Sequence, residues 1–269
     1  MCASHRNIYT HTRMQRSDRS NAVKIYLMSD IHGQADFFFQ LLEEMKVSDR
    51  DELYVLGDVV GKGAHSTEVL RYLMAHEEKA LLLRGNHEQK LLQYFGADTS
   101  ACIEAGKMRM KAPLYSEKAI RSWAEDDGKE TILEFLRMPA GERENCLDFI
   151  SRTALSCRRQ FYGRFYLMVH GAPSDQAAGA CRGFDVLENR YKRADVLNRT
   201  AGRETVQAGC TADKPIIITG HTPTFRYGAR YAGKLIRTED KILLDCGAGW
   251  GLGLGCLCLT DGTEFYARR

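Results

Sequence analysis

Short apolar runs recur along the chain, and Gly, Asp or Asn bounds each of them. Their length and their β-branched residues predict buried strands. The runs cover residues 23–28, 52–56, 80–83, 165–169, 215–219 and 241–244. Residues 241–267 are Gly-rich and strand-like, and Asp261-Gly262 within them predicts a tight hairpin turn.

Helical periodicity lies between the first three apolar runs. Residues 35–45 place Phe38 and Met45 on one helical face, and residues 66–76 repeat this pattern behind Ser66, a candidate N-cap. The alternation of strand and helix predicts parallel strand pairing and an α/β fold.

Residues 89–157 differ from the rest because they are charged, amphipathic and nearly free of strand signals. We expect a helical insertion that forms a cap or one wall of a groove. Its predicted helices cover residues 117–123, 129–137 and 142–157. We expect a single domain over residues 22–269, preceded by a disordered leader at residues 1–21, which has no apolar core segment and fails as a secretory signal.

Composition narrows the class of protein. Hydrophobic residues make up 44% of the 269 residues and charged residues 27%, as in ordinary soluble domains. A formal net charge of +3 is too small to imply nucleic acid or a membrane surface as partner. The nine cysteines are scattered without a C-x-x-C pair, which argues against disulfides and zinc fingers. We expect a cytoplasmic protein with reduced cysteines.

Polar side chains suited to metal binding directly follow five of the predicted strands. In order, the five signatures are Asp30-Ile31-His32-Gly33, Gly57-Asp58, Gly85-Asn86-His87-Glu88, His170-Gly171 and Gly220-His221. Ligands of an open α/β sheet bind beyond the carboxyl ends of its strands, so these side chains are expected to converge. Each short motif is weak alone, but all five after successive strands are specific.

The converging set would hold two Asp, one Asn and three or four His side chains. Carboxylate, amide and imidazole donors together suit divalent Mn, Fe or Zn. Six ligands are too many for one catalytic zinc with an open position. The sequence therefore predicts two metals that share a carboxylate, an arrangement that activates water against phosphate esters.

The five signatures in this order resemble the calcineurin-like metallophosphoesterases, and most closely their phosphoprotein phosphatase branch. That branch includes serine/threonine protein phosphatases, their bacterial and phage relatives, and symmetrical diadenosine tetraphosphate hydrolases. The resemblance covers roughly residues 23–267. It implies a four-layer αββα sandwich, in which helices flank two mixed β-sheets.

The resemblance also implies a role for each side chain. Asp30 and His32 would hold the first metal, Asp58 would bridge both, and the second metal would be completed by Asn86, His170 and His221. His87 would instead give a proton to the leaving oxygen. Two divalent ions are implied, with Mn first among the candidates and Fe, Zn or Mg behind it.

Two positions depart from the family pattern in the loop after the bridging Asp. Gly61 stands where the family has the Asp that orients the acid histidine, and Lys62 where it has a phosphate-binding Arg. Without that carboxylate the charged imidazolium is less favoured, and His87 should be a weaker acid catalyst for alkoxide leaving groups. We therefore expect substrates with good leaving groups, or another residue that orients His87. The candidate phosphate-binding residues are Asn86, Lys62, Arg84 and Arg190. Arg193 is an alternative candidate to Arg190.

The leading functional hypothesis is hydrolysis of phosphate monoesters, including phosphoserine or phosphothreonine in proteins. One alternative is a nucleotide or dinucleoside polyphosphate hydrolase, and another is a metal-dependent phospho-ligand-binding protein with little catalysis. The shape of the insertion separates the two substrate classes, since a closed cap suits small molecules and an open groove suits a phosphopeptide.

Overall fold

The computed structural model describes residues 23–97, 114–173, 183–197, 211–212 and 214–269. The predicted leader, residues 1–21, lies outside the described residues. A single domain over residues 22–269 stays a prediction.

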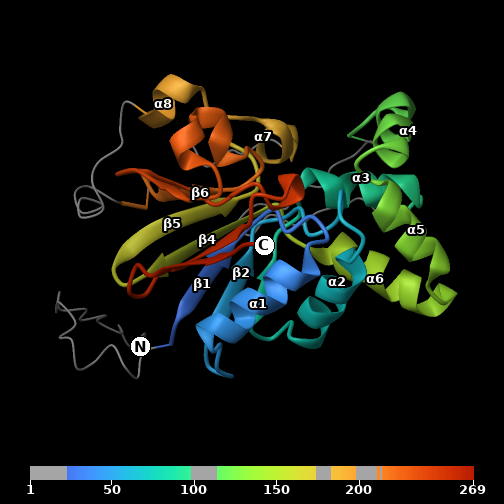
Figure 1. Ribbon diagram of the computed structural model, residues 1–269, viewed down its shortest axis with the longest axis horizontal. Helices are drawn as coiled ribbons and strands as arrows, with labels where there is room; N and C mark the ends of the chain where they lie inside the picture. The colour runs from blue at the N-terminus through green and yellow to red at the C-terminus, as the bar shows by residue number, and fades with distance from the viewer. Residues whose placement is uncertain (1–22, 98–113, 174–182, 198–210, 213) are drawn as a thin grey trace, which may run out of the picture.

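Two five-stranded mixed sheets form the centre of the molecule (Figure 1). The first sheet has the order β10-β9-β1-β2-β3. Strands β1, β2 and β3 are parallel, and β9 is antiparallel to both of its neighbours, β1 and β10. Its strands are β1 (Ile25–Met28), β2 (Glu52–Val55), β3 (Ala80–Leu82), β9 (Leu254–Cys258) and β10 (Glu264–Ala267). The turn predicted at Asp261-Gly262 lies between β9 and β10.

The second sheet has the order β4-β5-β6-β8-β7, with β5, β6 and β8 parallel and an antiparallel strand at each edge. Its strands are β4 (Ser156–Phe161), β5 (Arg164–Val169), β6 (Ile216–Thr219), β7 (Ile236–Arg237) and β8 (Lys241–Leu243). The helices of the described residues are α1 (Ala35–Met45), α2 (Ser66–Ala75), α3 (Asn86–Tyr94), α4 (Glu117–Glu125), α5 (Lys129–Arg137), α6 (Ala140–Arg152), α7 (Gly183–Glu188) and α8 (Arg193–Leu197).

The two sheets are packed face to face, with a layer of apolar side chains between them. Leu27 and Tyr54 of the first sheet share this core with Met168 and Ile218 of the second. The central strands are therefore buried on both faces, which explains why they read as continuous apolar runs rather than as an alternating pattern.

Helices cover the outer face of each sheet. Met28 and Val55 on the outer side of the first sheet lie in one core with Phe38 of α1. On the other side, Ile217 of β6 lies in one core with Val186 of α7. Figure 1 shows α1 and α2 on one side of the strands and α7 and α8 on the other. The predicted αββα sandwich is thereby confirmed.

The helical insertion is present as α4, α5 and α6, but the predicted end of its third helix is wrong. The helix predicted over residues 142–157 ends at Arg152, and the chain then forms β4, which pairs with β5 through contacts that no local pattern encodes. Helix α3 was not predicted, because its sequence NHEQKLLQY is mostly polar. Ser66 is also not an N-cap: it is the first helical residue, and its buried hydroxyl bonds to the Thr131 hydroxyl.

Two further findings concern membrane-spanning helices and cysteines. No helix among the described residues is long and apolar enough to cross a membrane. The five cysteines in the described ranges are all buried: Cys146, Cys157, Cys246, Cys256 and Cys258. The cytoplasmic location stays a prediction.

Candidate metal centre

The strands of each sheet end in register, so the loops that follow them meet at one edge. Met28 lies opposite Val55, and Val55 lies opposite Leu82. Asp58 sits at the middle of the resulting cluster. Its Oδ2 atom is 3.3 Å from Nε2 of His170 and 3.9 Å from Nε2 of both His32 and His87. A carboxylate in this position can be shared between two ions.

The structure brings all six predicted metal ligands together, and every one of them is buried. Two groups of side chains each bring their potential donor atoms within 4.8 Å of one another. One group is Asp58, His32 and His87, and the other is Asp58, His170 and His221. Asp30 is 3.9 Å from Nε2 of His32.

Four of the six predicted ligands have a left-handed backbone, an unusual conformation for residues with a side chain. The φ angles are 56° for Asp30, 50° for His32, 53° for Asp58 and 65° for His221. Such residues cost roughly 1–3 kcal/mol each and persist where their surroundings fix them. Here the His32 N–H donates to the Asp58 carbonyl at 2.9 Å, and the His221 N–H donates to the Asp30 carboxylate at 2.9 Å.

Glycine beside two of the ligands permits close approach of the backbone, as the sequence predicts. A Cβ atom on Gly220 would overlap the Asp30 carboxylate, and one on Gly85 would overlap the Asp58 carboxylate. These glycines therefore let carboxylates from one loop contact the backbone of the next.

Backbone carbonyls fix the ring protons of two histidines. Nδ1 of His170 lies 2.7 Å from the Leu56 carbonyl oxygen, and Nδ1 of His32 lies 3.2 Å from that of Val60. A carbonyl holds the proton on Nδ1 and turns the Nε2 lone pair towards the cluster, as in metal-binding histidines. Nε2 of His170 then faces Oδ1 of Asn86 at 3.0 Å as well as Asp58. Lone pairs that converge in this way fit a divalent cation.

The carboxylates of the cluster are held in opposite charge states. Burial would raise the pKa of Asp58, but His170 and His87 hold it well below its usual range. Burial, together with the neighbouring carboxylate of Asp245, raises the pKa of Asp30 well above its usual value. Although burial alone would lower the pKa of His170, Asp58 raises it to about 10. Asp58 thus carries a buried negative charge, which the neighbouring His170 imidazolium balances in the metal-free protein and which a bound cation would balance in its place.

Glu88 has a role that sequence reasoning missed. Its carboxylate accepts the backbone N–H groups of Gly85, Asp58 and Val59 at 2.8 Å each, and that of Val60 at 3.1 Å. It therefore ties the start of α3 to the loop that carries Asp58. Its place in Gly-Asn-His-Glu is the only sequence signal that could have indicated this.

Arg84 does not lie where its predicted phosphate-binding role requires. Its guanidinium is fully buried and donates to the carbonyl oxygens of Ile150, Ser151 and Thr153 and to Gln89. Carbonyls at the end of a helix lack partners within it, and Arg84 supplies partners for α6. The structure therefore gives Arg84 a structural role rather than contact with substrate.

The other two predicted cations lie at the rim of the centre. Nζ of Lys62 donates to Asp127 at 2.7 Å and lies 4.7 Å from the centroid of the Trp250 ring, so part of its charge is already paired. Arg190 is exposed, and its Nε lies 3.3 Å from Nε2 of His221. Arg193, the competing candidate, starts the exposed helix α8. The position of Arg190 beside a metal-type histidine favours it over Arg193.

Asp245, which lies two residues after the end of β8, is a further buried carboxylate near Asp30. Its Oδ1 atom accepts the Gly247 N–H at 2.9 Å, which is a turn-capping contact. Burial raises the pKa of Asp245 to about 7. No hydrogen bond from Asp245 to a histidine is found among the described residues.

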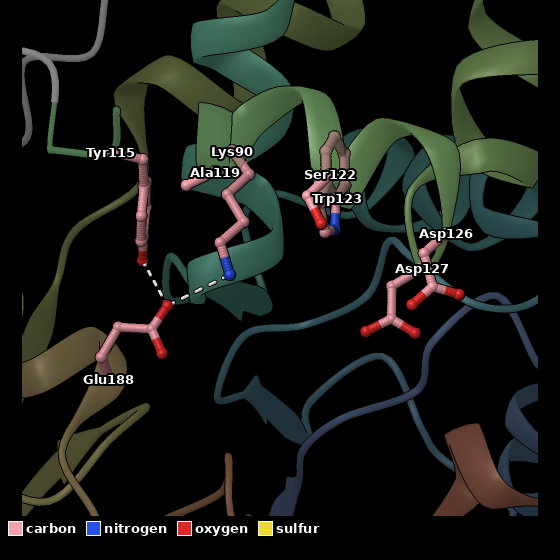
Figure 2. Close-up of a pocket in the computed structure, with 8 residues that line it drawn as sticks. All are labelled: Lys90, Tyr115, Ala119, Ser122, Trp123, Asp126, Asp127 and Glu188. Carbon is pink, nitrogen blue, oxygen red and sulfur yellow. Dashed lines mark hydrogen bonds and ion pairs between the residues drawn. The ribbon is translucent and has the colours of Figure 1, made fainter. Parts of the chain in front are cut away.

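A pocket of about 450 Å³ opens beside the centre, between α3, α4 and the end of α7. Figure 2 shows Tyr115, Lys90 and Glu188 at one end of the pocket and Asp126 and Asp127 at the other, with Trp123 between them. The Tyr115 hydroxyl donates to Glu188 at 2.7 Å, and Lys90 pairs with the same oxygen at 3.1 Å.

Three of the lining residues contact the centre directly. The Trp123 indole N–H donates to His87 at 3.0 Å, Asp127 accepts from Lys62, and the Glu188 carbonyl lies 3.1 Å from Nε2 of His221. A ligand in the pocket would therefore lie next to a phosphate held at the centre.

Comparison with known proteins agrees with this geometry. Residues 23–245 match the model of the calcineurin-like phosphoesterase family. The fold and the site place the chain among the metal-dependent phosphoesterases. The chain belongs to the calcineurin-like phosphoesterase family.

Similar curated proteins include two symmetrical bis(5′-nucleosyl)-tetraphosphatases. The one from Glaesserella parasuis is 27% identical over 176 residues, which are 60% of this chain and 62% of that protein. The one from Delftia acidovorans is 30% identical over 148 residues, 54% of this chain and 43% of that protein. The chain thus spans less than two thirds of the length of either relative.

Two solved structures share the fold. A proposed diadenosine tetraphosphatase superposes with a TM-score of 0.54 at 18% identity, covering 92% of this chain and 94% of the other. A serine/threonine phosphatase from Saccharomyces cerevisiae gives 0.52 at 16% identity, covering 92% and 80%. At such identities the likeness concerns the fold alone.

Proposed function

We propose that this chain is a two-metal hydrolase of nucleoside polyphosphates, in which water attacks phosphorus and a phosphoanhydride P–O bond breaks. The observation that carries the proposal is the pocket beside the centre. Its volume lies within the range of small-molecule sites, which is about 300–1,000 Å³. Helix α4 of the insertion forms one wall of this pocket.

The lining of the pocket suits a nucleoside. Tyr115 offers aromatic surface for a base, and the largely buried Trp123 closes the pocket beside it. Asp126 and Asp127 can accept hydrogen bonds from ribose hydroxyls, while their charge would repel additional phosphates. A neutral nucleoside in the pocket and its phosphates at the centre would satisfy both sets of side chains.

Six side chains would hold the two metals, with Asp58 shared between them: Asp30, His32, Asp58, Asn86, His170 and His221. Bound divalent ions would supply an acidified water and would neutralise charge on the phosphoryl group. Manganese is the first candidate, with iron, zinc and magnesium behind it. Arg190 and Lys62 at the rim would bind phosphate oxygens, and Asn86 and His87 would face them from the start of α3.

The relatives named as symmetrical tetraphosphatases support this substrate class, although the shared region covers only part of each. Phosphoserine or phosphothreonine in proteins is the second candidate, and the serine/threonine phosphatase fold is its support.

A substrate panel tests the proposal. The manganese-loaded chain should hydrolyse diadenosine tetraphosphate with a kcat/KM at least tenfold above that for p-nitrophenyl phosphate or a phosphoserine peptide, which is about 1.4 kcal/mol of preference. A phosphopeptide as the best substrate would overturn the proposal in favour of a protein phosphatase. Two bound ions without turnover of any substrate would overturn it in favour of a binding protein.

A variant pair locates the nucleoside. Tyr115→Ala should raise KM for diadenosine tetraphosphate and leave KM for p-nitrophenyl phosphate unchanged, because the smaller substrate does not reach the pocket. Tyr94→Ala is the matched control, since Tyr94 is exposed at the end of α3 and does not line the pocket. Equal effects of the two variants would contradict the placement.

A further inference from the structure

We infer that Trp123 of helix α4 is a positioning residue that fixes His87 as a neutral N–H donor and so adapts the site to phosphoanhydride substrates. The inference rests on the proposed function for its substrate class. The part of the inference that concerns which ring nitrogen of His87 carries the proton rests only on contacts between described residues.

The contact between the two rings defines where the ring proton lies. The indole N–H of Trp123 donates to Nδ1 of His87 at 3.0 Å, and the rings meet edge to face at 74°. An indole N–H can only donate, so Nδ1 must accept and cannot carry a proton. The proton of the neutral ring therefore sits on Nε2, which points into the cluster, 3.9 Å from Oδ2 of Asp58.

Gly61 explains why no carboxylate plays this part. Its backbone is left-handed, with φ of 92°, and a Cβ atom on it would overlap Nδ1 of His87. The imidazole fills the space in which a side chain at position 61 would begin. An aspartate there would have to displace the ring, so Gly61 and Trp123 form a matched pair around His87.

Trp123 itself is held rigidly. Its side chain is buried, and its ring lies against Gly128, where a Cβ atom would come within 2.6 Å of ring carbons. The Trp123 carbonyl accepts the Gly128 N–H at 2.7 Å, which closes the turn at the end of α4. The indole donor is thus in place before any substrate binds, as an orienting group must be.

The polarity of this contact has a chemical consequence. A carboxylate partner would accept a hydrogen bond from an Nδ1–H group and favour a doubly protonated ring that can act as an acid. Trp123 does the reverse and leaves a single proton, on Nε2. That N–H can donate a hydrogen bond to a departing oxygen, but transferring it fully would leave an imidazolate.

The leaving group decides whether a hydrogen bond suffices. When a phosphoserine ester is cleaved, the P–O electron pair goes to an alkoxide, which needs a proton. When a phosphoanhydride is cleaved, the pair goes to a phosphate oxygen, which is stable as an anion. A neutral donor serves the second reaction and not the first, in the way that a neutral histidine acts as an electrophile elsewhere.

The test compares Trp123→Phe, which keeps a ring and removes the donor, with Phe135→Leu, which disturbs the same helical insertion away from His87. Nitrogen NMR of His87 in the metal-free protein should show a protonated Nε2 and a bare Nδ1 in wild type and in Phe135→Leu. In Trp123→Phe the ring should exchange between tautomers.

The second readout is the ratio of kcat/KM for diadenosine tetraphosphate to that for an alkyl phosphate. We expect Trp123→Phe to lower this ratio at least tenfold and Phe135→Leu to leave it unchanged. Should Trp123→Phe fail to fold, Gly61→Ala provides the second variant, because its methyl group should displace the His87 ring and lower the ratio in the same way.

A protonated Nδ1 in wild type, or an unchanged tautomer in Trp123→Phe, would overturn the role of Trp123 whatever the substrate proves to be. A fixed Nε2–H tautomer in a protein that prefers phosphopeptides would instead overturn the proposed function and, with it, the link to phosphoanhydrides. The two failures are therefore distinguishable.

Discussion

Replacing Arg84 by methionine should destabilise the protein without weakening its binding of phosphate. The side chain is fully buried and joins the end of β3 to the last carbonyls of α6. Methionine fills similar space but donates nothing. The Ile150 carbonyl would keep the Thr153 hydroxyl, which donates to it at 2.6 Å, whereas the Ser151 and Thr153 carbonyls would lose the guanidinium.

The size of the effect follows from the two buried acceptors that lose Arg84, the Thr153 carbonyl and Oε1 of Gln89, because the Ser151 carbonyl is only partly buried. A buried polar group left without a partner costs about 1–3 kcal/mol, so the loss should be about 2–6 kcal/mol. At roughly 2–4 °C per kcal/mol for a chain of this size, a loss near the middle of that range lowers Tm by about 8–16 °C. Native domains have only about 5–15 kcal/mol in total, so the change should be visible in urea denaturation.

The assay pairs Arg84→Met with Arg190→Met, measuring urea denaturation and steady-state kinetics for each. Arg190 is exposed beside His221, so its replacement should change stability by no more than about 0.5 kcal/mol and raise KM. Arg84→Met should keep kcat/KM per folded molecule within about twofold of wild type. An Arg84→Met protein of normal stability and raised KM would refute the structural role and restore the phosphate-binding one.

Three further predictions concern other parts of the molecule. Asp51 accepts the N–H groups of Lys24 and Ser48. Burial raises the pKa of Asp51, but these hydrogen bonds lower the pKa overall. The contribution of Asp51 to folding stability is therefore present above the unfolded pKa of about 3.9 and is lost as pH falls through the folded pKa. Asp51→Asn should therefore cost about 1 kcal/mol in urea denaturation at pH 7, and a gap that persists undiminished at pH 3 would contradict this. His170→Asn should lower the manganese content after dialysis from about two ions to about one, because it removes a ligand of only one ion; unchanged content by elemental analysis would count against the assignment. Gly220→Ala should reduce manganese affinity in calorimetric titration, since its methyl group would displace the Asp30 carboxylate, and wild-type affinity would show that Asp30 is not a ligand.

Parts of the fold with a clear local pattern could be predicted from the sequence. Helices α1 and α5 have the predicted bounds, because an apolar stripe at helical spacing decides both. Elements set by distant partners could not. Strand β4 exists because residues 156–161 pair with β5, and no alternation of side chains marks it.

The same division holds for the site. The predicted ligands converge because each follows its own strand, which is a local signal repeated five times. The contact between Trp123 and His87 joins residues 36 positions apart, in an insertion whose docking the sequence does not encode. Arg84 was misassigned because its neighbours in sequence are metal ligands, whereas its guanidinium points to the end of α6.

The most direct measurement of the central claim is the turnover of diadenosine tetraphosphate by metal-stripped protein as manganese is added, with bound manganese measured in parallel. Turnover should rise as about two ions bind per chain, and Asp58→Asn should abolish it, because that carboxylate belongs to both groups of potential metal donors. Hydrolysis by the metal-free chain, or undiminished hydrolysis by Asp58→Asn, would contradict a two-metal centre at these residues.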